Sequence, residues 1–102
     1  MIDGDITTIK AELARRIGTI EWRASPARIA TEIDRIRAIA HRNRMLPAVT
    51  VAHLLESALA RGEHGMLVHS WLSVLGEAVA SERQDEAASD TFAAVCAVRF
   101  TH

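Results

Sequence analysis

The segment 25–44, which reads SPARIATEIDRIRAIAHRNR, constrains the fold more than any other part of the chain. Ser25 is a favoured cap for the first turn of a helix. Pro26 suits the first helical position, because its missing N–H would have no intrahelical partner there. Apolar residues then recur at alternating spacings of four and three, and form one stripe: Ile29, Ile33, Ile36 and Ala40. This periodicity predicts an amphipathic helix whose isoleucine stripe faces a core.

The same apolar periodicity predicts four further helices, over residues 5–22, 48–61, 65–83 and 85–100. Pro47 predicts an interruption between the second and third helices, because the residue before a proline disfavours the helical conformation. Gly62 occupies the position of a left-handed C-terminal cap after the third helix. The short connections between helices imply that successive helices are antiparallel. The sequence therefore predicts one all-α domain over residues 1–102, a compact up-down bundle of four to five antiparallel helices.

Composition agrees with a folded domain of this kind. The chain has 102 residues, of which 49% are hydrophobic and 25% charged, as in ordinary globular proteins. A single cysteine, Cys96, cannot form an internal disulfide and lies in an apolar run where we expect an unreactive thiol. The first ten residues lack the pattern of a signal peptide, and no stretch of about 20 apolar residues is present. We therefore expect a cytoplasmic protein that does not enter a membrane.

Charge is distributed unevenly along the chain although the net charge is only −1. Residues 1–50 carry nine basic and six acidic side chains, whereas residues 51–102 carry three basic and seven acidic ones. Opposite charge on the two halves favours association between copies of the chain. The small net charge predicts no general attraction to nucleic acid or to a membrane surface.

Arginines lie along the outer faces of the predicted helix 25–44. Glu32 and Asp34 are spaced three or four residues from several of them, which predicts intrahelical ion pairs on a solvated face. Arg42 and Arg44 lie beyond the reach of those acids. The pattern disfavours nucleic-acid binding, and a small DNA-binding regulator that uses this helix stays the weaker alternative.

Apolar residues cover a wide arc of the predicted third and fourth helices, more than one small bundle easily covers. These helices are either the buried centre of the domain or partly a self-association surface. The width of the arc favours self-association, most simply as a two-fold homodimer. Tryptophan is favoured in protein interfaces, although the core is its commoner place in so small a protein. The candidate surface for a protein partner therefore consists of Arg35, Arg42, Arg44 and Trp71.

No group of residues has the spacing of a catalytic, cofactor or metal site. His64 and His69 are five residues apart and so lie on different helical faces. His53 and Glu56 share a face, but the order is the reverse of the Glu-x-x-His pair of di-iron bundles and it occurs once. Nothing resembles a nucleophile elbow or a phosphate-binding loop. We therefore expect no enzyme activity, no metal and no cofactor.

The run 67–76 provides a second interpretation. It places His69 on a helix with Gly76 seven residues on, and over about ten residues it resembles the histidine-containing phosphotransfer domains, which are four-helix bundles with an exposed histidine. That family has a lysine and a glycine soon after the histidine, where this chain has Leu72 and Ser73. The resemblance implies a signalling module with His69 as the phosphoacceptor.

The sequence as a whole favours a non-enzymatic protein–protein interaction module, a small regulatory or adaptor protein. Its partner is a protein of unknown identity, with a second copy of the same chain as the simplest case. The phosphotransfer module and the DNA-binding regulator remain the alternatives.

Overall fold

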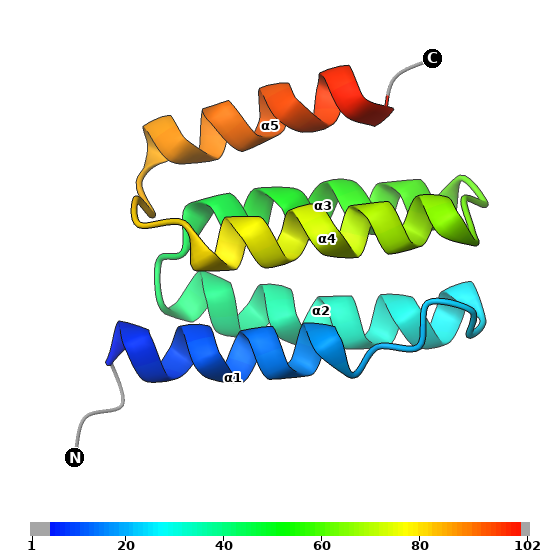
Figure 1. Ribbon diagram of the computed structural model, residues 1–102, viewed down its shortest axis with the longest axis horizontal. Coiled ribbons are helices and arrows are strands. Elements are labelled where there is room, and N and C mark those ends of the chain that lie inside the picture. Colours follow the sequence, from blue (N-terminus) through cyan, green and yellow to red (C-terminus); the bar gives the residue numbers. More distant parts are fainter. Residues whose placement is uncertain (1–4, 101–102) are drawn as a thin grey trace.

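The computed structural model describes residues 5–100, and this part of the chain forms five α-helices and no strand. The helices are α1 (Ile6–Gly18), α2 (Pro26–Arg42), α3 (Leu46–Ala60), α4 (Met66–Ala80) and α5 (Glu86–Phe100). Successive helices run in opposite directions, and the principal extents are 41 × 26 × 16 Å (Figure 1). The prediction of a compact all-α bundle is confirmed.

Helix α3 lies at the centre of the bundle. It contacts α2, α4 and α5, whereas α1 packs mainly on α4 and makes a smaller contact with α2. From the bottom of the view in Figure 1 to its top, the pair α1–α2 is followed by the pair α3–α4 and then by α5 alone. Helix α5 therefore covers one side of the α3–α4 pair with no described helix beside it at its own level.

The isoleucine stripe of α2 is buried, as its spacing predicted. Every helix contributes to the same hydrophobic cluster. The largest fully buried side chains are Leu13, Ile33, Ile36, Met45, Leu55, Leu75, Val51, Val68, Val74, Val79 and Pro47. One continuous core thus holds all five helices.

The wide apolar arcs of α3 and α4 are covered within the chain. His53 and Ala60 are the only exposed residues of α3, because α2, α4 and α5 enclose it. Helix α4 packs against α1 and α3, its Trp71 also reaches Phe100 of α5, and most of its exposed residues are polar. Of the two places that the sequence left open for these arcs, the structure puts them at the buried centre of the domain, because α3 is enclosed by three helices and α4 packs between α1 and α3.

Helix ends follow the predicted capping chemistry. The Arg28 N–H donates to Ser25 Oγ at 3.3 Å, which caps α2. Asp5 and Asp85 accept backbone N–H groups in the first turns of α1 and α5 in the same way. Gly62 has φ +92°, so it ends α3 in the left-handed conformation that its position indicated.

Three helix boundaries differ from the sequence prediction. Helix α1 ends at Gly18, four residues before Trp22, because the chain then turns through residues 19–25. Helix α3 begins at Leu46, since Pro47 is accommodated in the first turn, where its missing N–H has no intrahelical partner. Helix α4 ends at Ala80, where the Gln84 amide nitrogen donates to the last carbonyls, among them Ser81 O at 2.6 Å. That side-chain cap lies four residues downstream and carries no local sequence signal.

Candidate functional site

The arginines of α2 divide into paired and unpaired side chains. Arg35 pairs with Glu32 at 3.1 Å, as predicted. Arg37 pairs with Asp34 at 2.6 Å and also reaches Glu56 of α3 at 3.0 Å. Such partly exposed ion pairs contribute little to stability. Arg35 and Arg37 are therefore ordinary residues of a solvated helix face, each with an acidic partner.

Arg28, Arg42 and Arg44 are exposed, and none of them forms an ion pair with an acidic residue in the part of the chain that the structure describes. Glu32 is spaced to reach either Arg28 or Arg35, and it pairs with Arg35. Arg28 and Arg42 lie on the same outer side of α2 as Arg35, because the three positions are spaced by seven residues. We call the surface formed by Arg28, Arg35 and Arg42 the arginine face.

Arg44 stands in a backbone conformation that favours glycine. Its φ is +57°, and it is the only non-glycine residue with a positive φ among residues 5–100. The turn is held by the Met45 N–H, which donates to Ala40 O at 2.9 Å. The arrangement is that of a left-handed C-terminal cap, with arginine at the position where glycine is usual.

Replacing Arg44 with glycine is expected to raise the free energy of unfolding by about 1 kcal/mol, because glycine adopts positive φ without the steric cost of a Cβ. The measurement is urea unfolding of the R44G variant followed by circular dichroism. Arg42→Gly is the matched control, and it should lower stability because Arg42 is helical. A loss of stability in R44G would contradict the assignment of this turn.

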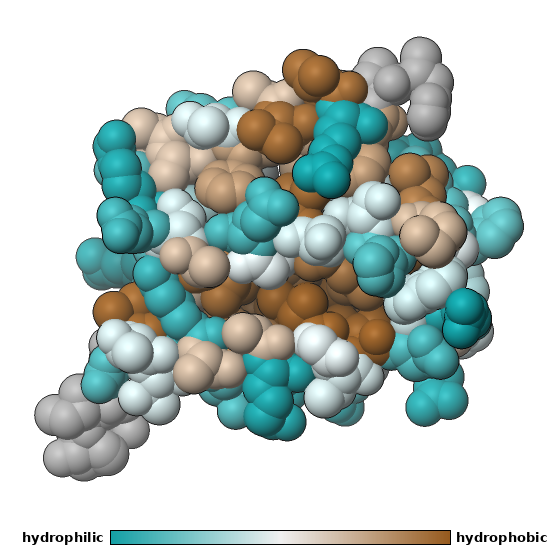
Figure 2. Space-filling model, viewed as in Figure 1, coloured by the Kyte–Doolittle hydropathy of each residue, from teal (hydrophilic) through white to brown (hydrophobic). Residues whose placement is uncertain are grey.

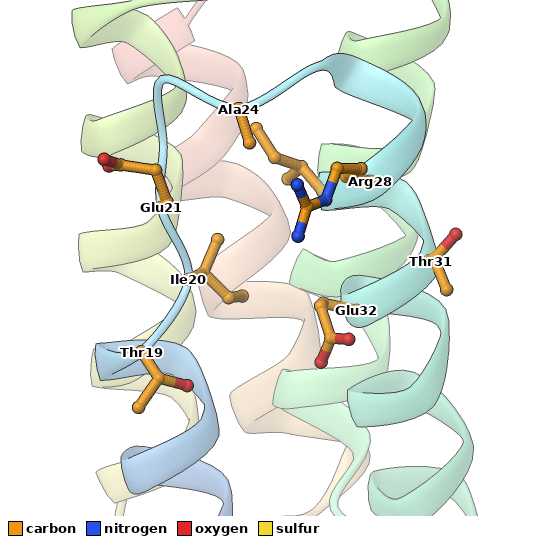
Figure 3. Close-up of a pocket in the computed structure, with 8 residues that line it drawn as sticks. Thr19, Ile20, Glu21, Ala24, Arg28, Thr31 and Glu32 are labelled. Atoms are coloured by element: carbon orange, nitrogen blue, oxygen red, sulfur yellow. The ribbon is translucent and has the colours of Figure 1, made fainter.

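A hollow of about 490 Å³ lies between the α1–α2 loop and the first turns of α2 (Figure 3). Its lining is mixed, with apolar side chains at Ile20, Ala24 and Ile29 and polar ones at the rim. Figure 3 shows the Arg28 guanidinium reaching across the hollow and the Glu21 carboxylate directed away from it. This arrangement suits a contact with an apolar side chain beside an acid. It lacks a nucleophile next to a base.

A second hollow lies on the other side of the same loop and includes Trp22 and His69. The Trp22 ring meets the His69 ring edge-on, with 5.5 Å between centroids, and the Arg23 guanidinium lies 4.4 Å from the centre of the Trp22 ring. These contacts tie the loop to α4. The Trp22 side chain is half-buried, and it contacts both His69 and Arg23.

His69 is exposed and lies in the first turn of α4, where its N–H donates to Gly65 O. Leu72 and Ser73 occupy the positions where the phosphotransfer domains have a lysine and a glycine. Leu72 is buried and Ser73 is exposed. The Trp22 ring forms part of the surface beside His69. A role of His69 as phosphoacceptor stays a prediction.

Trp71 belongs to the core, and its expected place in a contact surface is corrected. The residue is 3% exposed, and its ring stacks on Phe100 of α5 at a centroid distance of 3.9 Å. Its Nε1–H donates to Glu63 Oε1 at 3.0 Å. Trp71 therefore joins α4 to the end of α5 and to the turn before α4.

Helix α5 carries the apolar surface that sequence reasoning missed. It packs on the bundle through Ser89, Cys96 and Phe100, whereas Val98 is 84% exposed and Val95 39% exposed on the side away from the core. Figure 2 shows hydrophobic side chains at the top of the molecule, over α5. The signal in the sequence was the spacing of these valines, which places them off the stripe formed by Cys96 and Phe100.

The chemistry of the remaining groups is limited. Burial raises the pKa of the Cys96 thiol above its usual range, so the thiolate is disfavoured at neutral pH. Within residues 5–100, no three histidine, cysteine or acidic side chains lie close enough to hold a metal ion. The helices of this part of the chain are also too short or too polar to cross a bilayer.

A scan against protein-family models found no match, and searches of curated proteins and of solved structures found none either. Function is therefore inferred from the residues and their arrangement in this chain. The features that remain unaccounted for by folding are the exposed valines of α5, the arginine face and the hollow beside Arg28.

Proposed function

We propose that this protein is a non-enzymatic protein–protein interaction module that associates with itself through α5. The single observation that supports the proposal is an exposed apolar side on a helix whose opposite side already packs on the core. We call this side the α5 face. Its members are all exposed and are Ala87, Thr91, Ala94, Val95 and Val98.

The α5 face has the composition of a helix-packing surface. Its alanines are small, so a partner helix can approach the backbone closely, and its valines supply the apolar area. Complete burial of one valine side chain contributes about 1.5 kcal/mol or more to association. Val98 is exposed at the centre of this helix side, so we expect its burial to contribute more to association than that of the other residues of the α5 face.

A second copy of the chain is the partner that the charge distribution favours. The acidic half, which includes α5, and the basic half, which includes α1 and α2, attract each other between molecules. A regulatory or adaptor protein in the cytoplasm, with one buried and reduced cysteine, is consistent with these features.

The test is the mass of the protein in solution, measured by light scattering after size-exclusion chromatography. The expected result is a mass above 11.2 kDa that rises with concentration in the micromolar range. The Val98→Glu substitution should weaken association at least about tenfold, because it removes the valine contact and places a charge in the interface. Its fold should persist, since Val98 is almost fully exposed.

Ala14→Glu is the matched control. It introduces the same side chain at an exposed position of α1, away from α5, and should leave the assembly unchanged. A wild-type protein that stays monomeric up to about 100 μM, where even a weak interface would be partly populated, contradicts the proposal. Undiminished assembly of V98E would place the interface elsewhere and would also contradict it.

A further inference from the structure

We infer that the α5 face of one copy binds the arginine face and the adjoining hollow of a second copy. This inference rests on the proposed self-association and adds the identity of the surface that α5 meets. The contact is head-to-tail, because two different surfaces come together. It is therefore distinct from the two-fold dimer that is the simplest form of self-association.

The arrangement of the helices supports a head-to-tail contact. Helix α5 lies on one side of the α3–α4 pair and the α1–α2 pair lies on the other (Figure 1). The α5 face of one molecule and the α1–α2 surface of the next can therefore meet without a clash between the two cores. Each molecule keeps one surface of each kind free after the first contact, so copies add in a row.

The apolar parts of the two surfaces are complementary. The hollow beside Arg28 has apolar lining at Ile20, Ala24 and Ile29, and half-buried Ile39 lies further along α2. Its volume of about 490 Å³ accommodates small aliphatic side chains. Val95 and Val98 are such side chains and are exposed on α5.

The charges of the two surfaces are also complementary. Glu86 and Asp90 flank the α5 face and form no ion pair within the described residues, and Arg28 and Arg42 are equally unpaired. A helix α5 laid antiparallel to α2 brings Asp90 beside Arg42. At the helical rise of 1.5 Å per residue, Arg99 lies about 13 Å from Asp90 along α5, and Glu32 lies about 15 Å from Arg42 along α2. The same placement therefore brings Arg99 near Glu32.

A two-fold contact between two α5 helices lacks this match. In an antiparallel two-fold pair each flank of the helix meets the same flank of its copy. The flank that carries Glu86 and Asp90 would then meet only those acids and alanine, so no cation would face them. The arginine face supplies the cations that α5 itself does not place there.

The deciding experiment mixes two variants, each of which damages one surface. Arg42→Glu reverses a charge on the arginine face, and Val98→Glu disrupts the α5 face. Each variant alone should assemble at least tenfold more weakly than the wild type. The equimolar mixture should form a 1:1 complex at twice 11.2 kDa, because the intact α5 face of R42E meets the intact arginine face of V98E. Each variant alone, at the same total concentration as the mixture, is the control and should stay largely monomeric.

The alternatives give different results. If R42E assembles like the wild type while V98E does not, the contact is a two-fold one through α5; the head-to-tail inference is then wrong and the proposed function stands. If both variants are weakened but their mixture stays monomeric, the head-to-tail contact is also contradicted. A wild-type protein that does not associate contradicts both the inference and the proposed function, as does assembly that neither substitution weakens.

Discussion

Replacing Trp71 with alanine is expected to lower the free energy of unfolding by about 3–5 kcal/mol, one of the two largest effects in this chain. The substitution removes the ring that stacks on Phe100 and the N–H that donates to Glu63. It also leaves a cavity among α4, α5 and the turn before α4. Small domains are stable by about 5–15 kcal/mol, so this loss is a large share of the total.

Two further variants separate the contributions of Trp71. Trp71→Phe keeps an aromatic ring against Phe100 but loses the hydrogen bond to Glu63, and we expect an intermediate loss of stability. Trp22→Ala is the matched control, because Trp22 is the other tryptophan and is only half-buried. Urea unfolding followed by far-ultraviolet circular dichroism measures all three. A W71A variant that is no less stable than W22A would contradict the core role of Trp71.

Replacing Ile33 with alanine is the second large effect, with an expected loss of about 2–5 kcal/mol. Ile33 is fully buried at the middle of the α2 stripe, where the surrounding side chains cannot collapse completely into the space left behind. Ile33→Val, which removes one methylene, should cost only about 0.5–1.5 kcal/mol.

Ile6 provides the matched control for Ile33. It is also a helical isoleucine, but it is 39% exposed, so Ile6→Ala should cost clearly less than Ile33→Ala under the same conditions. Comparable losses at the two positions would contradict the expectation that burial of the stripe determines the effect, since alanine forms helices better than isoleucine does. Midpoints of thermal unfolding are a second measurement of the same difference.

Much of the fold was predictable from local patterns. The stripe of α2, the Ser25 cap and the left-handed Gly62 are each encoded within one or two turns of helix, and each was confirmed. The ends of α1 and α4 were less predictable. The Gln84 amide that caps α4 acts from outside the helix, so its contribution depends on how the next turn folds.

The candidate site was predictable only in part. The spacing of Glu32 and Asp34 indicated correctly that Arg35 and Arg37 are paired, and that Arg42 has no acid within reach along the helix. The pairing of Arg37 with Glu56 and the hollow beside Arg28 arise between segments distant in sequence. Trp71 shows the same limit, because the partner that buries it, Phe100, lies on another helix.

The sequence by itself determined which segments are helical and which side of α2 is apolar, because helix periodicity and capping are local properties of the chain. Only the tertiary structure decided which apolar sides are covered. It buried the arc of α3 among α2, α4 and α5 and the arc of α4 against α1 and α3, and it left Val95 and Val98 on the surface. Burial depends on which elements lie next to each other in space. An apolar run therefore has the same sequence pattern whether or not another helix packs on it.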